Sequence, residues 1–173
     1  AVETLDGVVD DIGAARRGDL SEDDGDLLAR LLRARDRGEQ TDAQLRDELV
    51  TALLAGHDTT ALTRTYTLAL LADHPEVAAR AREEVADVVG DERPGMAHVR
   101  EFEYVEWVIR EAMRCYPPVY TIFRGPTEDV TLAGYDVPTG TALMLPQWAV
   151  HRSERFWDDP AAFRPERFRP EAV

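Results

Sequence analysis

A cluster of small and polar residues interrupts the apolar stretch LVTALLAGHDTTALT, residues 49–63. Glycine in a helix interior costs about 1 kcal/mol relative to alanine, and threonine hydroxyls there compete for backbone carbonyls. Ala55 and Thr59 are four residues apart, as are Gly56 and Thr60, so on a helix each pair shares one face. The small side chains open a notch on that face, in which a small molecule could approach the backbone.

Asp58 lies in the same turn and is a candidate proton carrier, while Thr59 could hydrogen-bond a ligand or the carbonyl of Ala55. A packing groove for a crossing helix, with Asp58 in a salt bridge, explains the same residues. A metal-dependent hydrolase that uses His57 and Asp58 is a weaker interpretation, because the four histidines show no close ligand spacing. The turn alone therefore leaves both a ligand site and a packing groove open.

Two further patterns combine charges with apolar surroundings. Glu111 and Arg114 are three residues apart in EAMR and meet on one face of a helix that is apolar elsewhere. Such a pair is favourable in a protein interior only if both partners make further hydrogen bonds, for example to a second arginine. Arg167 lies in FRPERF between Phe163 and Phe168, which is typical of a charge held by an aromatic-anchored loop. Taken singly, each pattern also fits a solvated surface pair or turn.

The sequence around these residues predicts a mainly α protein with a small β-meander. Apolar residues at helical spacing, a capping box that begins at Thr41 and a proline in a first turn mark the helices. The helix that carries the notch has about 30 residues and a length of about 45 Å, so it would cross a whole domain. Alternating residues around a Pro-Thr-Gly turn predict the strands. Within one partial domain, 1–173, we expect a short helix over 20–38, a long helix over 41–73, helices over 75–90 and 101–116, a β-meander over 119–150 and an irregular PERF segment over 151–173.

Composition restricts the class of protein. With 173 residues and 44% hydrophobic content, the chain can form one folded domain. Its net charge of −14, from 34 acidic residues against 20 arginines and no lysine, argues against nucleic-acid and anionic-membrane partners. No stretch of about 18 uncharged apolar residues predicts a membrane helix, and the single cysteine fits a reducing compartment. We therefore expect a cytoplasmic protein. The lack of lysine fits either a salt-rich cytosol or a G+C-rich genome.

The order of the motifs is more specific than any one of them. A long helix with Ala-Gly-x-Asp-Thr-Thr precedes a helix with Glu-x-x-Arg that ends in Tyr-Pro-Pro, and then come Gly-Tyr-Asp-Val-Pro-x-Gly and Phe-x-Pro-Glu-Arg-Phe. In this order and spacing the chain closely resembles the cytochrome P450 family of haem-thiolate monooxygenases, over nearly all of residues 20–170. The resemblance implies an α-rich fold, present incompletely, and haem (iron protoporphyrin IX) as cofactor of the full-length parent. It also implies a small organic substrate, dioxygen, an electron donor such as a ferredoxin or a reductase, and insertion of one oxygen atom into the substrate.

The resemblance assigns roles to the polar turn and to one arginine. Thr59 would match the family's threonine that hydrogen-bonds dioxygen, and Asp58 the neighbouring acid that relays protons. Ala55 and Gly56, together with Thr59, would lie against the haem. Arg124 matches the arginine that usually pairs with a haem propionate.

Glu111, Arg114 and Arg167 resemble the family's buried Glu-Arg-Arg cluster, which fastens the loop region behind the haem and has a structural role. The stretch 119–123 would border the substrate.

One feature of the family pattern is missing. The axial cysteine belongs to a Phe-x-x-Gly-x-x-x-Cys-x-Gly loop downstream of PERF, and the chain ends at Val173 before such a loop. Cys115 does not match that ligand, because it precedes Pro117-Pro118 without a glycine-rich loop, and we interpret it as a packing residue. We therefore expect a fragment that runs from before the dioxygen-binding helix to the PERF motif, holds no metal ligand and is inactive by itself. A non-enzymatic helical interaction module on the same scaffold is the open alternative.

Overall fold

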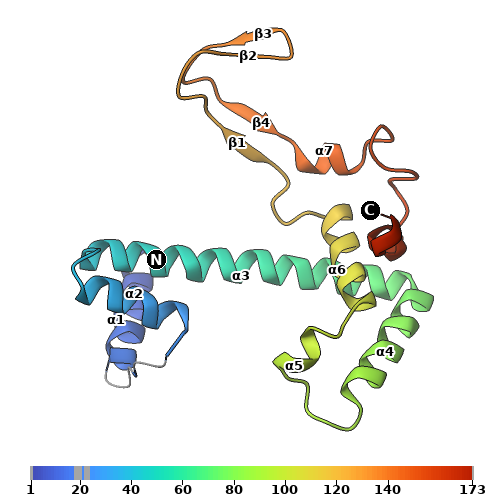
Figure 1. Cartoon of the computed structure of the whole chain (residues 1–173), viewed down its shortest axis with the longest axis horizontal. Coiled ribbons are helices and arrows are strands. Elements are labelled where there is room, and N and C mark those ends of the chain that lie inside the picture. The colour runs from blue at the N-terminus through green and yellow to red at the C-terminus, as the bar shows by residue number, and fades with distance from the viewer. Residues whose placement is uncertain (1, 18–20, 22–23, 173) are drawn as a thin grey trace. The chain divides into compact units, whose positions relative to one another are not determined.

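The computed structural model describes residues 2–17, 21 and 24–172, and residues 1, 18–20, 22–23 and 173 lie outside this description. The excluded residues include part of the expected helix 20–38 and the end of the expected PERF segment. Two compact units, Ala1–Asp58 and Thr59–Val173, are described separately, and the helix α3 belongs to both. The elements in chain order are α1 Val2–Arg17, α2 Leu27–Asp36, α3 Asp42–Asp73, α4 Pro75–Val89, α5 Met96–Val99, α6 Tyr104–Cys115, β1 Ile122–Arg124, β2 Val130–Leu132, β3 Tyr135–Val137, β4 Leu143–Leu145, α7 Gln147–His151 and the 3-10 helices η1 Pro165–Phe168 and η2 Pro170–Ala172 (Figure 1).

The first unit contains α1, α2 and the beginning of α3. The N-cap residue of α2 is Asp26, whose carboxylate accepts the backbone N–H of Ala29 at 2.9 Å. The start of α3 has the expected capping box, because Thr41 and Gln44 exchange hydrogen bonds between side chain and backbone. No helix was predicted over α1, because its two glycines interrupt the helical pattern. Packing against α2 outweighs their helix penalty, and the buried apolar residues among the described side chains of this unit include Val9, Ala29, Leu32 and Leu45.

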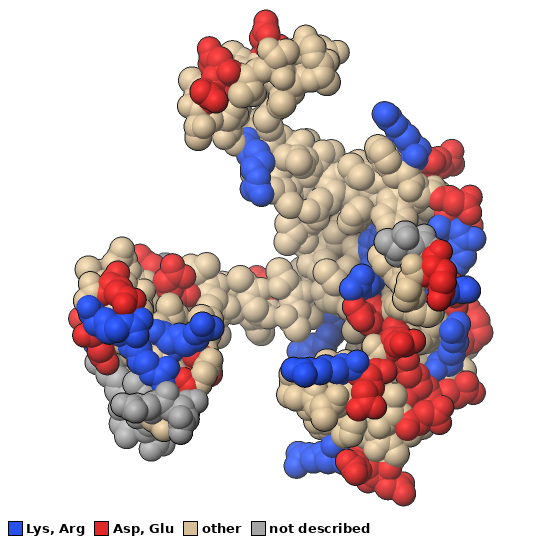
Figure 2. All heavy atoms as spheres, in the orientation of Figure 1, with Lys and Arg blue, Asp and Glu red and all other residues tan. Residues whose placement is uncertain are grey.

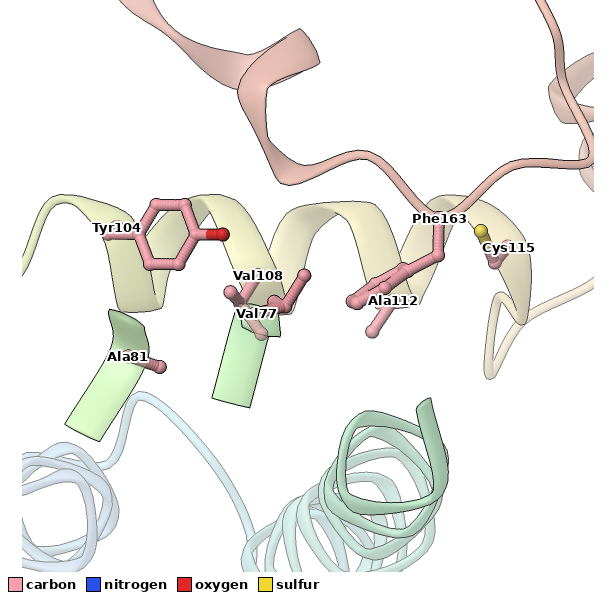
Figure 3. Close-up of a cluster of buried hydrophobic side chains, with 7 residues drawn as sticks. All are labelled: Val77, Ala81, Tyr104, Val108, Ala112, Cys115 and Phe163. Carbon is pink, nitrogen blue, oxygen red and sulfur yellow. The ribbon is translucent and has the colours of Figure 1, made fainter. Parts of the chain in front are cut away.

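The core of the second unit lies on one face of α6. Tyr104, Val108, Ala112 and Cys115 recur every three or four residues along this helix and are all buried. Figure 3 shows α4 below them and Phe163 reaching onto Ala112 from the C-terminal segment. The core residues from all three segments are Val77, Ala81, Tyr104, Val108, Ala112, Cys115 and Phe163. The core therefore connects α6 to the segment that precedes PERF.

The strands form two antiparallel pairs, one nested inside the connection of the other (Figure 1). β1 pairs with β4, and β2 pairs with β3 through a two-residue turn at Ala133 and Gly134, which have φ angles of 51° and 86°. Positive φ at both positions is the geometry of a tight hairpin turn. In a meander β1 would pair with β2; here the strands of 119–150 form nested hairpins, because the Pro-Thr-Gly turn leads back to β1.

Short helices occupy parts of the chain for which none was predicted. α5 lies in the loop after α4, α7 follows β4, and PERF itself forms the 3-10 helix η1. The mainly helical class with small antiparallel sheets is confirmed. Among the described residues, no helix is both long and apolar enough to cross a membrane.

The beginning of α6 is capped by a side chain from another helix. The N-cap residue of α6, Glu103, makes no capping hydrogen bond with its side chain. Instead the Glu84 carboxylate of α4 accepts the backbone N–H groups of Glu103, Tyr104 and Val105 at 2.9, 2.7 and 2.8 Å. Burial by itself would raise the pKa of Glu84, but these three hydrogen bonds outweigh it and hold the pKa below the ordinary value of 4.5.

We predict that Glu84→Gln lowers the free energy of unfolding by about 1–2 kcal/mol at pH 7, because the amide has only one oxygen to accept these bonds and carries no charge at the helix start. A pKa that is lower in the folded state gives stability that is complete above pH 4.5 and is lost as the pH falls through the folded value. The difference between wild type and variant, measured by urea denaturation, should therefore shrink below about pH 4. A difference that stays constant down to pH 2.5 would contradict the capping role.

Candidate functional site

Two buried charges form the centre of the site. Glu111 and Arg114 lie one turn apart on α6, and their exposed fractions are 0% and 2%. The Arg114 guanidinium donates from Nε to Glu111 Oε2 at 2.7 Å and from Nη2 to Oε1 at 2.8 Å. This two-pronged geometry is the strong form of an arginine–carboxylate pair. The Glu111–Arg114 ion pair is therefore buried and held in one geometry by two hydrogen bonds.

Arg114 also holds the segment that follows α7. Its Nη1 donates to the carbonyls of His151 and Pro160 at 2.8 and 2.9 Å, and Nη2 donates to the carbonyl of Ala162 at 3.0 Å. The guanidinium carbon lies 5.1 Å from the centre of the Trp157 ring. Burial alone would lower the pKa of Arg114, but its hydrogen bonds and charge interaction with Glu111 outweigh burial and raise that pKa. The side chain is therefore a permanent cation that ties three backbone carbonyls to α6.

The third charge comes from PERF. Arg167 Nε donates to Glu111 Oε1 at 3.3 Å, and the same guanidinium donates to the carbonyls of Asp158 and Asp159. The backbone N–H of Arg164 reaches the same Glu111 oxygen at 2.9 Å. The structure thus brings Glu111, Arg114 and Arg167 together in one buried cluster, hereafter the Glu-Arg-Arg cluster.

Sequence reasoning did not identify the groups that complete the cluster. Five of these groups are backbone carbonyls and one is a backbone N–H, and side-chain patterns carry no signal for either. Trp157 was also missed, although the aromatic spacing of FWDDPAAF offered a weak signal. The hydrogen bonds of the cluster depend on a loop conformation that only tertiary structure defines.

The polar turn of α3 lies on an accessible part of the helix. Ala55, Gly56 and Asp58 are exposed, and Thr59 is half-buried. Outside its own helix, no atom of the described residues lies within 4 Å of the position that a Gly56 Cβ would occupy. The helix continues through the turn, where Thr63 Oγ1 donates to the Thr59 carbonyl at 2.8 Å. Figure 2 shows mostly uncharged atoms along the middle of α3. The backbone there is open to a flat or small ligand.

A groove connects Thr59 with the cluster inside the second unit. Its volume is about 740 Å³, which suits a cofactor or a small organic molecule. His151 lines it with an imidazole whose Nδ1 has no hydrogen-bond partner among the described residues, and burial lowers the pKa of this ring. Most of the exposed lining surface is apolar, although three arginines contribute to it. The lining includes Thr59, Thr60, Thr63, Arg64, Arg110, Met113, Arg114, Pro117, Val119, Trp157 and Phe168. The groove is therefore an apolar site with Thr59 at its wall and the Glu-Arg-Arg cluster next to it.

Arg124 lies apart from the cluster, whereas Cys115 contacts it without supplying a reactive thiol. Arg124 is exposed on β1, where its Nη1 donates to the carbonyl of Phe123 at 3.3 Å, and it has no hydrogen bond to the cluster among the described residues. Cys115 is 5% exposed, and its Sγ accepts a hydrogen bond from Arg114 Nη2 at 3.2 Å. Burial raises the pKa of the Cys115 thiol, which keeps it protonated and unreactive. Among the described residues, no three His, Cys, Asp or Glu side chains are arranged to bind a metal.

Comparison with known proteins gives one consistent result. The family model for cytochrome P450 matches residues 1–173. The chain is 36% identical over 168 residues to pentalenene oxygenase of Streptomyces avermitilis, covering 96% of this chain and 37% of that protein. It is 35% identical to cyclooctat-9-en-7-ol 5-monooxygenase of Streptomyces melanosporofaciens, covering 93% of this chain and 36% of that protein. A solved structure of a zebrafish cytochrome P450 with progesterone matches with a TM-score of 0.87 at 29% identity, covering 98% of this chain and 42% of that one. The chain thus spans little more than a third of these two curated relatives.

Proposed function

Because the chain belongs to the cytochrome P450 family, we propose that the protein carrying it is a haem-dependent monooxygenase of small organic molecules. Residues 1–173 would contribute the helix on the oxygen side of the cofactor and the Glu-Arg-Arg cluster that supports the cofactor site. The observation that carries this proposal is the hydrogen-bonded cluster, with Glu111 and Arg114 buried and Arg167 at its edge, next to an open apolar groove with Thr59 in its wall.

The residues of this chain fit one side of a haem. Within the second unit, the groove has the size of a cofactor site and the exposed Arg124 guanidinium can pair with an acidic substituent. In the first unit, the space beside Gly56 on α3 holds no atom of the described residues from outside the helix within 4 Å. Haem, when bound, supplies the iron at which dioxygen is reduced so that one oxygen atom is transferred to the substrate. The chain's own side chains then orient the reactants and move protons.

We assign proton delivery to Asp58 and Thr59. The Asp58 carboxylate is exposed and can exchange protons with water, whereas the neighbouring Thr59 hydroxyl is half-buried on the groove side. A carboxylate followed by a hydroxyl can pass a proton inward, since each group both accepts and donates when protonated. Asp58 would thus be the surface acid and Thr59 the donor to the reacting oxygen.

The substrate would border residues 119–123, of which Val119 lines the groove and Tyr120 and Phe123 are exposed. The two bacterial relatives are named as oxygenases, one of pentalenene and one of cyclooctat-9-en-7-ol. An apolar substrate of small or medium size fits these side chains. Electrons would come from a separate ferredoxin or reductase in the cytoplasm.

The experiment that tests the proposal is the carbon monoxide difference spectrum of the reduced protein that carries this chain. We expect the absorption band of a haem with a thiolate ligand. Cys115→Ser should leave that band unchanged, because the Cys115 thiol is buried, protonated and bonded to Arg114. For the same reason residues 1–173 expressed alone should give no thiolate band and no turnover.

Two outcomes would count against the proposal. A protein that folds but gives no haem spectrum would favour the non-enzymatic interaction module. Loss of the thiolate band in Cys115→Ser, with haem retained, would make Cys115 the ligand and overturn the role assigned to it here.

A further inference from the structure

α4 contacts both the start of α6 and the 3-10 helix η1, through two charged residues one helical turn apart. Glu84 caps the start of α6, as described above. Arg80 Nη1 donates to Glu166 Oε1 at 2.7 Å, and the guanidinium carbon of Arg80 lies 3.9 Å from the centre of the Tyr104 ring. In the space-filling view, acidic and basic side chains alternate over the part of the molecule that contains α4 and α6 (Figure 2). The Arg80–Glu166 ion pair thus lies on a charged surface, and it joins α4 to Glu166 of the PERF segment.

Glu166 and Arg167 are neighbours in η1 and attach this one-turn helix to α6 at two points. Arg167 binds Glu111 directly, while Glu166 is held against Tyr104 through Arg80. Tyr104 and Glu111 are seven residues apart on α6, so they lie on the same face two turns from each other. Besides the Arg164 N–H bond to Glu111 and the packing of Phe163, these two side-chain contacts along one helix face restrict the position and the direction of η1.

The two side-chain contacts differ in burial. The Arg167 and Glu111 side chains are 9% and 0% exposed, and their 3.3 Å hydrogen bond is long, so a shift of η1 would alter it. The Arg80–Glu166 pair is half exposed, with 51% and 36% of the two side chains accessible. Its loss should therefore shift η1 without unfolding the protein.

We propose that Arg80 is a positioning residue for the Glu-Arg-Arg cluster: it holds Glu166 against Tyr104 and thereby sets where Arg167 meets Glu111. The importance of this role rests on the proposed function, since the cluster would support the cofactor, but the contact itself is independent of haem.

The test uses the protein that carries this chain, labelled with 5-fluorotryptophan and observed by fluorine NMR. Trp157 is a suitable reporter, because its ring centre lies 6.3 Å from that of Phe168, the last residue of η1, and 5.1 Å from the Arg114 guanidinium. Its resonance is assigned with Trp157→Phe. Arg80→Met should shift this resonance and accelerate hydrogen exchange at the η1 amides about tenfold, the size expected for an exposed ion pair plus a cation–π contact. Arg80→Lys should restore much of both.

The matched control is Arg82→Met, which removes the same charge from an exposed position of α4. It should change neither the resonance nor the exchange. A Trp157 resonance that stays in place in Arg80→Met would overturn the proposal, as would an equal shift in Arg82→Met. Both readouts are native-state signals that do not need haem, so a failure to bind haem would reject the proposed function and leave this result standing.

Discussion

Arg114→Met should lower the free energy of unfolding by about 3–5 kcal/mol, the usual cost of leaving a buried charge without its partner. Glu111 is 0% exposed, and without Arg114 its carboxylate keeps only Arg167 at 3.3 Å and the Arg164 N–H at 2.9 Å. The carbonyls that Arg114 binds lose their donor at the same time. Urea denaturation followed by tryptophan fluorescence measures the change, and Trp157 reports it directly because its ring lies against the Arg114 guanidinium.

Arg110→Met is the matched control for this prediction. Arg110 is also on α6 and also pairs with a glutamate, but both side chains of the Arg110–Glu106 pair are more than half exposed, at 56% and 55%. Its loss should cost less than about 0.5 kcal/mol. The double variant Glu111→Leu/Arg114→Met should lose less stability than the sum of its single variants, since it removes both fully buried charges together and leaves Arg167 with the carbonyls of Asp158 and Asp159 as acceptors. Additive losses, or equal losses for Arg110 and Arg114, would show that the cluster is not a coupled buried unit.

The sequence contains enough information to predict the class of fold and the three charges of the cluster. The three-residue spacing places Glu111 and Arg114 on one helix face, and the need of a buried pair for more hydrogen bonds points to a second arginine. That this arginine is Arg167, more than 50 residues later, came from the family resemblance, because spacing does not connect such distant positions. Helical periodicity is local, whereas the contact between η1 and α6 is not.

The structural features that the sequence did not predict all depend on tertiary contacts. α1 contains glycines whose helix penalty only packing can offset, and the nested strand pairing depends on where β4 returns to β1. The cap on α6 is invisible in the sequence before that helix, because its carboxylate comes from Glu84 on α4. The role of Arg80 belongs to the same class, since a surface arginine on an amphipathic helix carries no local signal of what it contacts.

In the proposed monooxygenase that carries this chain, Asp58→Asn should lower kcat about 100-fold, which is within the usual contribution of a positioned acid–base group. Asparagine has nearly the shape of aspartate and can still hydrogen-bond, but it cannot take up and release a proton. Asp58 is exposed and Thr59 is half-buried on the groove side, so removing the carboxylate should interrupt proton supply from water without changing the groove. Substrate affinity, measured by titration, should therefore stay within about twofold of wild type, because only an interaction needed in the transition state has been removed.

Slower proton delivery has a second signature that separates it from misfolding. When proton transfer limits turnover, the ratio of kcat in H2O to kcat in D2O should be larger for Asp58→Asn than for wild type. Asp47→Asn, at an exposed position of the same helix three turns earlier, removes the same charge and should leave kcat and the isotope ratio unchanged. Asp58→Glu keeps an acid and should retain most of the activity. If Asp58→Asn turned over at the wild-type rate with the wild-type isotope ratio, protons would have to reach Thr59 by another route, and the exposed carboxylate would have no catalytic role.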